Sequence, residues 1–399
     1  MPRIALIPGD GIGVEVVREA RRVLEFVSEA EGVTFELVEW DLGADRFLRD
    51  GITITEDEFV SLDRDHDAVL LGALGDPRVP SNQHAKDILL GMRFKLDLYV
   101  NFRPCVLISP ELSPLATVSP LRLEIFRENT EGEYTGMGGV TRKNTPDEVA
   151  IEENLATRHG VERIIRAAFQ FAESRGRDRV TLVDKANVMR YVGDLWRRTF
   201  SDVASEYADI EVDEMYVDAM AMDLVRRPER YQVLVTSNLF GDIISDLAAE
   251  ITGGLGMAPS ANVHPGRNVL FEPVHGSAPD IAGKGVVNPI ATILSVAMMF
   301  KYTFELNQVS AELDGADRQA TRSTTSDFRR LKVEEAHLMN ASFLRALHFE
   351  NIADITMNSL KEYYLELLCN LEEDKWEAIY RYILSSRKLV KFKNDHGLN

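Results

Sequence analysis

The sequence predicts an α/β protein built on a mostly parallel, doubly wound sheet. Short apolar runs of strand length alternate with longer stretches of helical periodicity. Candidate functional residues follow several of the apolar runs, and the carboxyl ends of strands are where such folds place their chemistry. The chain has 399 residues, 45% of them hydrophobic, so it can bury a large core in two to three domains.

Composition excludes several classes of protein. The net charge of −19 disfavours nucleic acids and anionic membranes as partners. No apolar run approaches the roughly 18 residues of a membrane helix, and the N-terminal run enters a glycine loop before a signal region develops. A cytoplasmic location is therefore expected. Cys105 and Cys369 are the only cysteines and lie far apart in sequence, so a metal would need oxygen or imidazole ligands.

The first unit reads as a strand, a glycine loop and a helix. Residues 3–8 form an apolar run, Gly9–Gly13 is a turn, and apolar residues recur at helical spacing from Val14 to Leu24. The glycine spacing lacks the register of a dinucleotide fingerprint. A tight turn without a ligand is an equally good interpretation. Further strands are expected at 34–39 and 67–72.

Three arginines occur in apolar or glycine-rich surroundings. Guanidinium groups bind carboxylates through paired hydrogen bonds, although an arginine considered alone is more often a surface ion pair. Their shared context favours a carboxylate-binding site. The candidates are Arg93, Arg103 and Arg127, with Leu89 and Leu90 before the first and Tyr134 after the third.

Another candidate is Lys185, which ends a predicted buried strand beginning at Arg179. Neighbouring cations and burial can lower the pKa of a lysine so that it acts as a general base. A lysine that reaches solvent is an equally good interpretation. Asp218 offers a carboxylate further along the chain, and a strand at 233–238 leads into the next candidate.

Asp242 and Asp246 lie four residues apart in an otherwise apolar stretch. On a helix such residues share a face, so two oxygen ligands suited to Mg²⁺ would lie side by side. A solvated acidic face is the alternative. Apolar neighbours such as Ile243 and Leu247 predict burial of the segment, and buried carboxylates need a partner.

Taken together, these segments resemble the metal-dependent β-decarboxylating dehydrogenases, the family of isocitrate, 3-isopropylmalate, tartrate and D-malate dehydrogenases. The resemblance covers about Ile4 to Lys301. It implies an isopropylmalate-dehydrogenase-like, non-Rossmann fold and a homodimer. The implied parts are a large cofactor-binding domain at 1–99 and 254–330, a small domain at 100–253 with the substrate and metal site and the dimer interface, and a helical C-terminal extension at 331–399.

The resemblance also implies residue roles. The arginines would clamp a dianionic 2-hydroxy acid, and Lys185 would take its hydroxyl proton as hydride passes to the cofactor. Loss of CO₂ would follow, and Tyr134 would protonate the carbon. Mg²⁺ or Mn²⁺ would be held by Asp218, Asp242 and Asp246. Lys185 and Asp218 would reach into the site of the partner subunit.

The cofactor prediction rests on Asp280 and Ile281, which follow a His-Gly-Ser-Ala-Pro run. NADP-using members carry a lysine and a tyrosine there, whereas a carboxylate accepts from ribose hydroxyls and repels a 2′-phosphate. NAD is therefore predicted. The implied lining residues are Glu272, His275, Gly276, Ser277, Ala278, Asp280, Ile281 and Asn288.

Leu89 and Leu90 resemble the pocket that receives the isopropyl group in 3-isopropylmalate dehydrogenases. Lys86 stands where several of those enzymes carry a glutamate, and it could meet an extra anionic group. The predicted function is oxidative decarboxylation of a 3-substituted malate, with 3-isopropylmalate favoured, as in leucine biosynthesis. D-malate or tartrate dehydrogenase, a specialised-pathway relative and a non-catalytic regulatory subunit are alternatives. The apolar face of residues 331–399 is expected to contact the protein's own body or another protein.

Overall fold

The computed structural model describes residues 1–304, apart from residues 32, 108–109, 117–119 and 268. The predicted extension at 331–399 and the end of the segment 254–330 lie outside the described residues. Among the described helices, none combines the length and the apolar character needed to cross a membrane.

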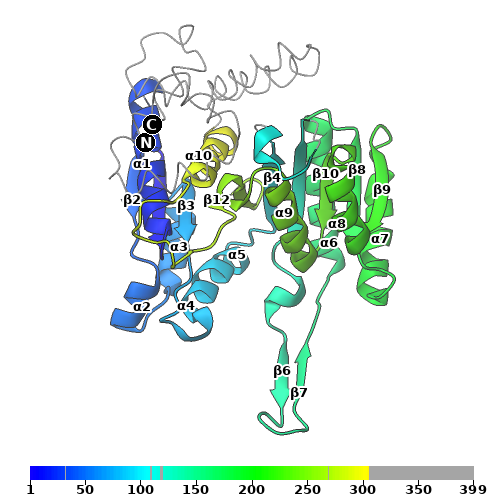
Figure 1. Cartoon of the computed structure of the whole chain (residues 1–399), viewed down its shortest axis with the longest axis horizontal. Coiled ribbons are helices and arrows are strands. Elements are labelled where there is room, and N and C mark those ends of the chain that lie inside the picture. The colour runs from blue at the N-terminus through cyan, green and yellow to red at the C-terminus, as the bar shows by residue number, and fades with distance from the viewer. Residues whose placement is uncertain (32, 108–109, 117–119, 268, 305–399) are drawn as a thin grey trace.

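Figure 1 shows a broad sheet covered by helices, with a thin two-stranded arm projecting from one side. The strands are β1 (Arg3–Gly9), β2 (Glu36–Glu39), β3 (Ala68–Ala73), β4 (Val100–Val106), β5 (Arg122–Glu128), β6 (Gly138–Thr141), β7 (Val149–Glu152), β8 (Arg179–Asp184), β9 (Glu211–Tyr216), β10 (Val233–Thr236), β11 (Pro259–Val263) and β12 (Val269–Pro273). The helices are α1 (Gly13–Glu31), α2 (Ala44–Asp50), α3 (Glu56–Arg64), α4 (Gln83–Ala85), the π-helical η2 (Lys86–Leu90), α5 (Gly91–Lys95), α6 (Arg158–Ser174), α7 (Arg190–Ala204), α8 (Val217–Arg226), α9 (Asn238–Ile251) and α10 (Ile290–Tyr302).

Ten of the described strands form one sheet in the order β2-β1-β3-β12-β11-β4-β5-β10-β8-β9. Neighbouring strands are parallel towards both edges, whereas β11 runs antiparallel to β12 and β4, and β4 runs antiparallel to β5. The prediction of a mostly parallel, doubly wound sheet is confirmed. The strand order also differs from that of a Rossmann domain.

Helices cover both faces of the sheet. On one face α1, α10, α6 and α7 contribute to a single apolar cluster. On the other face α8 and α9 pack over β5, β8 and β10, and α3 and α5 pack over β1 and β3. Because β1 and β3 are covered on both sides, their sequences are continuous apolar runs without alternation.

The largest cluster crosses the domain boundary expected near residue 100. Phe102 of β4 packs against Phe126 and Phe171, each at a ring-centroid distance of 5.1 Å. The same cluster includes Leu6 of β1 and Val296 of α10. One apolar layer therefore joins the two predicted domains, and the division into 1–99 with 254–330 and 100–253 stays a prediction.

The arm of β6 and β7 is antiparallel and its residues are exposed. Three of its apolar side chains, Val140, Val149 and Ile151, have exposed fractions between 40% and 52%, and Met137, directly before β6, is 50% exposed. A two-stranded hairpin is marginally stable by itself in water. Its apolar surface is therefore suited to contact with another protein surface.

The start of α3 provides a measurable contribution to stability. The Thr55 side chain accepts from the Glu58 N–H, and the Glu58 carboxylate accepts from the Thr55 N–H and pairs with Arg46 at 2.7 Å. Although burial opposes ionisation, the hydrogen bonds from Arg46 and Thr55 lower the pKa of Glu58 from its ordinary 4.5. The ionised Glu58 therefore stabilises the fold above pH 4.5, and this is lost as pH falls through the lowered pKa.

We expect Glu58→Gln to lower the free energy of unfolding at neutral pH by about 1 kcal/mol. The difference from wild type should shrink on acidification, because protonation removes the same charge from the native protein. Urea denaturation across this pH range measures both effects. Asp57→Asn, an exposed change in the same helical turn, is the control. A pH-independent difference for Glu58→Gln would contradict the assignment.

Candidate active site

The candidate residues gather where several strands end. β5, β8 and β10 are parallel neighbours, so their carboxyl ends lie at one edge of the sheet. Arg127 is the penultimate residue of β5, Lys185 directly follows β8, and α9 starts two residues after β10. The predicted strand-end position of Lys185 is confirmed to within one residue, because β8 ends at Asp184.

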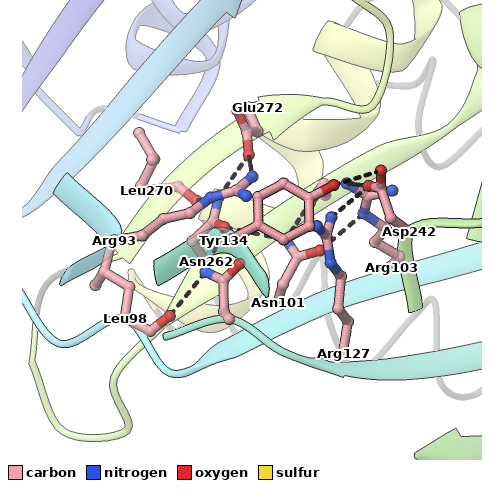
Figure 2. Close-up of polar contacts among 12 residues, drawn as sticks. Arg93, Leu98, Asn101, Arg103, Arg127, Tyr134, Asp242, Asn262, Leu270 and Glu272 are labelled. Carbon is pink, nitrogen blue, oxygen red and sulfur yellow. Dashed lines mark hydrogen bonds and ion pairs between the residues drawn. The ribbon is translucent and has the colours of Figure 1, made fainter. Parts of the chain in front are cut away.

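Asp242 is the centre of a group of donors, as Figure 2 shows. Arg127 Nη1 lies 2.5 Å from Asp242 Oδ1, and Arg103 Nη2 lies 3.3 Å from the same oxygen. The Tyr134 hydroxyl donates to Asp242 Oδ2 at 3.0 Å. Two predicted substrate arginines, the predicted proton donor and one predicted metal ligand are therefore neighbours within one chain.

Burial determines the electrostatics of this group. Burial and the neighbouring Arg103 and Arg93 lower the pKa of Arg127 to about 9, so its guanidinium is charged at neutral pH. Burial works against ionisation of Asp242, but Arg127, Arg103 and the Tyr134 hydroxyl together lower its pKa. Burial and the nearby Asp242 raise the pKa of Tyr134, which keeps the phenol protonated. The group thus holds a carboxylate, two cations and a proton donor in contact.

A row of buried asparagines connects this group to the third arginine. In the sheet, Asn262 of β11 is the register partner of Asn101 of β4, which is the partner of Arg127 of β5. Asn101 donates to Asn262 at 3.0 Å and accepts from Arg103 Nε at 2.8 Å. Asn262 in turn donates to Glu272 at 2.8 Å. Figure 2 shows these side chains side by side between Asp242 and Glu272.

At the other end of the row Arg93 pairs with Glu272. Their atoms lie 2.9 Å apart, and the two side chains are 5% and 9% exposed. Arg93 was predicted to bind substrate and Glu272 to line the cofactor site. The ion pair places these two predicted sites in direct contact.

Sequence reasoning missed the asparagines and serines that orient the arginines. Asn238 accepts from Arg127 with its backbone and side-chain oxygens, and Ser245 accepts from Arg103 at 2.7 Å. A usable signal was present: asparagine is depleted in strands, yet Asn101 and Asn262 each lie within one. Such residues indicate a polar group that requires a partner inside the sheet.

Helix α9 is less buried than the sequence suggested. Its Gly241, Ile244 and Ala248 face the core, but Ile243 is 54% exposed and Asp246 is exposed as well. The expectation that apolar neighbours keep the whole segment inside is therefore wrong. One helical face packs on the sheet while the adjoining face remains open in the single chain.

Lys185 and Asp218 occupy a separate position. Lys185 Nζ forms an ion pair with Asp218, which lies in the first turn of α8. The centroid of the Tyr216 ring lies 5.7 Å from Lys185 Nζ and 5.1 Å from Arg197 Cζ. In the described residues neither Lys185 nor Asp218 contacts Asp242, so a single chain does not assemble the whole predicted set.

The donor set fits a divalent cation. Asp242 and Asp246 are one helical turn apart, and burial together with the charge of Asp242 raises the pKa of Asp246. Mg²⁺ and Mn²⁺ prefer carboxylate oxygens as ligands. A cation between these two carboxylates would also relieve their mutual repulsion. No described group of three His, Cys, Asp or Glu side chains could hold a metal ion. A third carboxylate would have to come from elsewhere, as predicted for Asp218.

The predicted cofactor loop lies against the N-terminal glycine loop. Ile12 N donates to the Ser277 carbonyl at 2.9 Å, and Gly283 N donates to Glu15 at 2.5 Å. His275 Nε2 is buried without a hydrogen-bond partner among the described residues, and burial lowers the pKa of this imidazole. An unused polar atom in a loop of turn formers fits a nucleotide ligand. Two segments that are distant in the sequence thus form one surface.

Leu89 and Leu90 lie in the π-helical turn before α5. Both are partly buried, and Leu89 also packs against the cluster formed with Phe59 and Ile88. Leu90 does not belong to that cluster. Arg93 follows on the same helical segment. The role of the two leucines as a substrate pocket stays a prediction.

Comparisons with known proteins all identify isocitrate or isopropylmalate dehydrogenases as similar to this chain. The model of a family described as isocitrate/isopropylmalate dehydrogenase matches residues 3–342. The 3-isopropylmalate dehydrogenase of Corynebacterium kroppenstedtii is 48% identical over 330 residues, covering 82% of this chain and 96% of that protein. The protein of the same name from Thermobifida fusca is 46% identical over 335 residues, with 81% and 94% covered. The crystal structure of isocitrate dehydrogenase from Methylococcus capsulatus is 37% identical, with a TM-score of 0.70 and 79% and 91% covered. The family match continues to residue 342, beyond the stretch from about Ile4 to Lys301 that carries the resemblance in the sequence.

Arg127→Lys should lower the free energy of unfolding by about 2 to 3 kcal/mol, because lysine cannot reproduce the fork that satisfies Asn238 and Asp242. Urea denaturation of the metal-free protein measures this. Arg198→Lys changes an exposed helical ion pair and should have an effect of less than about 0.5 kcal/mol. Equal effects of the two substitutions would contradict the buried role of Arg127.

Proposed function

This chain belongs to the isocitrate/isopropylmalate dehydrogenase family, and we propose that it oxidatively decarboxylates 3-isopropylmalate to 4-methyl-2-oxopentanoate and CO₂ with NAD as oxidant. The observation that carries this proposal is the 46–48% identity, over more than four fifths of the chain, to proteins named for that substrate. The cluster of Arg103, Arg127, Tyr134 and Asp242 provides the chemistry that such a reaction needs. We further propose a role in leucine biosynthesis and a cytoplasmic location.

Arginines and Tyr134 would act on the substrate carboxylates and carbon skeleton. A dianionic malate requires fixed cations, and Arg103 and Arg127 are buried guanidinium groups oriented by asparagine and serine oxygens. The same cations stabilise the negative charge that develops when the β-carboxylate leaves as CO₂. Tyr134 holds a proton at its hydroxyl, within hydrogen-bond distance of Asp242, and is the group proposed to deliver it to carbon.

Asp242 and Asp246, with Asp218 of a second subunit, would hold Mg²⁺ or Mn²⁺. When bound there, the cation would supply the Lewis acidity that lowers the pKa of the substrate hydroxyl, and NAD would be the hydride acceptor. The segment from His275 to Asn288 would line the NAD site. Asp280 is exposed, as a residue that accepts from ribose hydroxyls would be. Lys185 would take the hydroxyl proton.

A homodimer would complete the site. Lys185 and Asp218 pair with each other at one end of the sheet, apart from Asp242. Beside them α8 and α9 carry exposed apolar side chains, including Met222 at 66% and Ile243 at 54%. An isologous interface over these helices would bury that surface and bring Lys185 of each subunit to the site of the other. The β6–β7 arm offers a second apolar surface for the same association.

The purified protein should produce NADH from 3-isopropylmalate with Mg²⁺ or Mn²⁺, and more slowly from D-malate, tartrate and isocitrate. Absorbance at the NADH band measures this. Omission of the metal should abolish turnover, and NADP should replace NAD poorly because Asp280 repels a 2′-phosphate. Absence of turnover with every one of these acids would contradict the proposed function.

Lys185→Met should lower kcat by about 10²- to 10⁴-fold, because the proton acceptor is lost. Tyr134→Phe should mainly slow release of the protonated product, so pre-steady-state traces should show a burst of NADH. Stopped-flow absorbance distinguishes the two variants. Normal turnover by Lys185→Met would remove Lys185 from the mechanism.

Mixing two inactive variants tests the shared site. Each mixed dimer of Lys185→Met and Asp246→Asn chains would contain one intact site, since Lys185 acts in the partner. Refolding an equal mixture should recover about a quarter of wild-type activity, because half of the dimers are mixed. Each variant refolded alone is the control. No recovery from a mixture that forms dimers would contradict the exchange of Lys185.

A further inference from the structure

A buried contact between a histidine and an aspartate lies outside the Asp242 group. His84 is fully buried and Asp10 is 6% exposed, and His84 Nε2 lies 2.7 Å from Asp10 Oδ2. Because the carboxylate can only accept, the imidazole places its proton on Nε2. His84 Nδ1 is buried without a hydrogen-bond partner among the described residues. Asp10 is thus the one polar group that His84 contacts there.

The Asp10 carboxylate holds three segments of the chain together. Its Oδ1 accepts from Ala44 N at 2.6 Å, at the start of α2, and its Oδ2 accepts from Gly75 N at 2.7 Å, in the loop after β3. The third segment is α4, through His84. Gly43 makes this possible, because a Cβ there would lie 2.7 Å from Asp10 Oδ1.

Backbone contacts link Asp10 to the proposed NAD loop. Two residues after Asp10, Ile12 N donates to the Ser277 carbonyl at 2.9 Å. Gly11 between them has a φ of +55°, and a Cβ there would lie 2.1 Å from the Ser277 carbonyl oxygen. The Asp10 loop and the loop at Ser277 are therefore in van der Waals contact and have little freedom to separate.

The helical segment that begins at His84 continues to the proposed substrate site. α4, η2 and α5 follow one another without a break from Gln83 to Lys95. Leu89, Leu90 and Arg93 lie on this segment. A second tie holds its beginning, since Asn82 Oδ1 accepts from Asp76 N at 3.1 Å in the same loop as Gly75.

The pair is better suited to fixing a position than to stabilising the fold. Desolvation of the buried Asp10 carboxylate and of the His84 ring opposes the attraction gained from their contact. An apolar side chain of similar size could pack on Phe47, whose ring lies 6.3 Å from that of His84, without leaving a buried nitrogen unpaired. What an apolar residue cannot supply is a directional bond to Asp10.

We propose that the His84–Asp10 contact fixes the segment carrying Leu89, Leu90 and Arg93 against the NAD loop, so that His84 is a positioning residue coupling malate binding to NAD binding. This inference rests on the proposed function. The segment delivers the apolar pocket and one guanidinium, while Asp10 reaches the nucleotide side through Ile12 and Ser277. Without the contact between His84 and Asp10, the segment from Gln83 to Lys95 can shift relative to the loop at Ser277.

Two substitutions of similar size isolate the contact. His84→Gln fills most of the space and places an amide nitrogen close to the position of Nε2, so it can still donate to Asp10. His84→Leu fills the same space but cannot donate. His66→Ala is the control for loss of a buried histidine, because His66 is 5% exposed and contacts Trp40 and Ser61 but not Asp10.

We expect His84→Leu to raise KM for 3-isopropylmalate and the Kd for NADH about fivefold to tenfold each, with kcat changed by less than about threefold. His84→Gln should remain within about twofold of wild type. His66→Ala should lower the melting temperature without altering either constant. Steady-state kinetics give the KM and kcat values, and NADH fluorescence gives the Kd without turnover.

A folded His84→Leu protein with unchanged KM and Kd would overturn the inference. An equal shift in His84→Gln or in His66→Ala would also overturn it, since the effect would then follow general loss of packing. If His84→Leu does not fold, His84→Asn replaces it, because that amide is too short to reach Asp10. Failure of wild type to oxidise any 3-substituted malate would instead reject the proposed function, and the NADH titrations would still report on the contact.

Discussion

Burial of the Arg127 guanidinium is the constraint on which the site depends. This side chain is 1% exposed, and a charge at that depth persists only when every donor has a partner. Its partners come from both ends of the first turn of α9: Asn238 at the start of the helix and Asp242 one turn later. The helix must therefore begin directly after β10 and lie across the end of β5. The position of Asp242, and with it the proposed metal site, follows from satisfying one arginine.

The antiparallel strands in the middle of the sheet extend this arrangement. A fully parallel sheet buried on both faces is apolar throughout, but here β11, β4 and β5 bring Asn262, Asn101 and Arg127 into one row. The Asn101 and Asn262 amides each donate and accept a hydrogen bond. They therefore form a continuous chain of hydrogen bonds from Arg103 to Glu272. The proposed NAD side and the proposed metal side of the site are joined through hydrogen-bonded strands, which limits how far either can move alone.

Helix α9 and the Asp10 loop illustrate two ways in which polar groups hold distant segments. In α9, Ile244 and Ala248 pack on the sheet while Asp242 and Asp246 point to the arginines and Ile243 remains exposed. The helix therefore presents a core face, the face of the proposed metal site and an exposed face within one turn. Asp10 instead gathers backbone N–H groups of Ala44 and Gly75, which no side-chain pattern in the sequence reveals. Both depend on carboxylates whose burial is compensated by nearby donors.

The sequence by itself determined the fold class and indicated the residue types of the proposed site. Apolar periods placed the strands and helices within a few residues, because these periods are local properties of the chain. The spacing of Asp242 and Asp246 predicted their common face for the same reason. Only the tertiary structure decided that Asn101, Asn238, Asn262 and Ser245 orient the arginines, that Ile243 is exposed, and that Asp10 contacts His84. These outcomes depend on strand pairing and helix packing between segments that are, in several cases, more than a hundred residues apart, and contacts at that separation are not a local property of the chain.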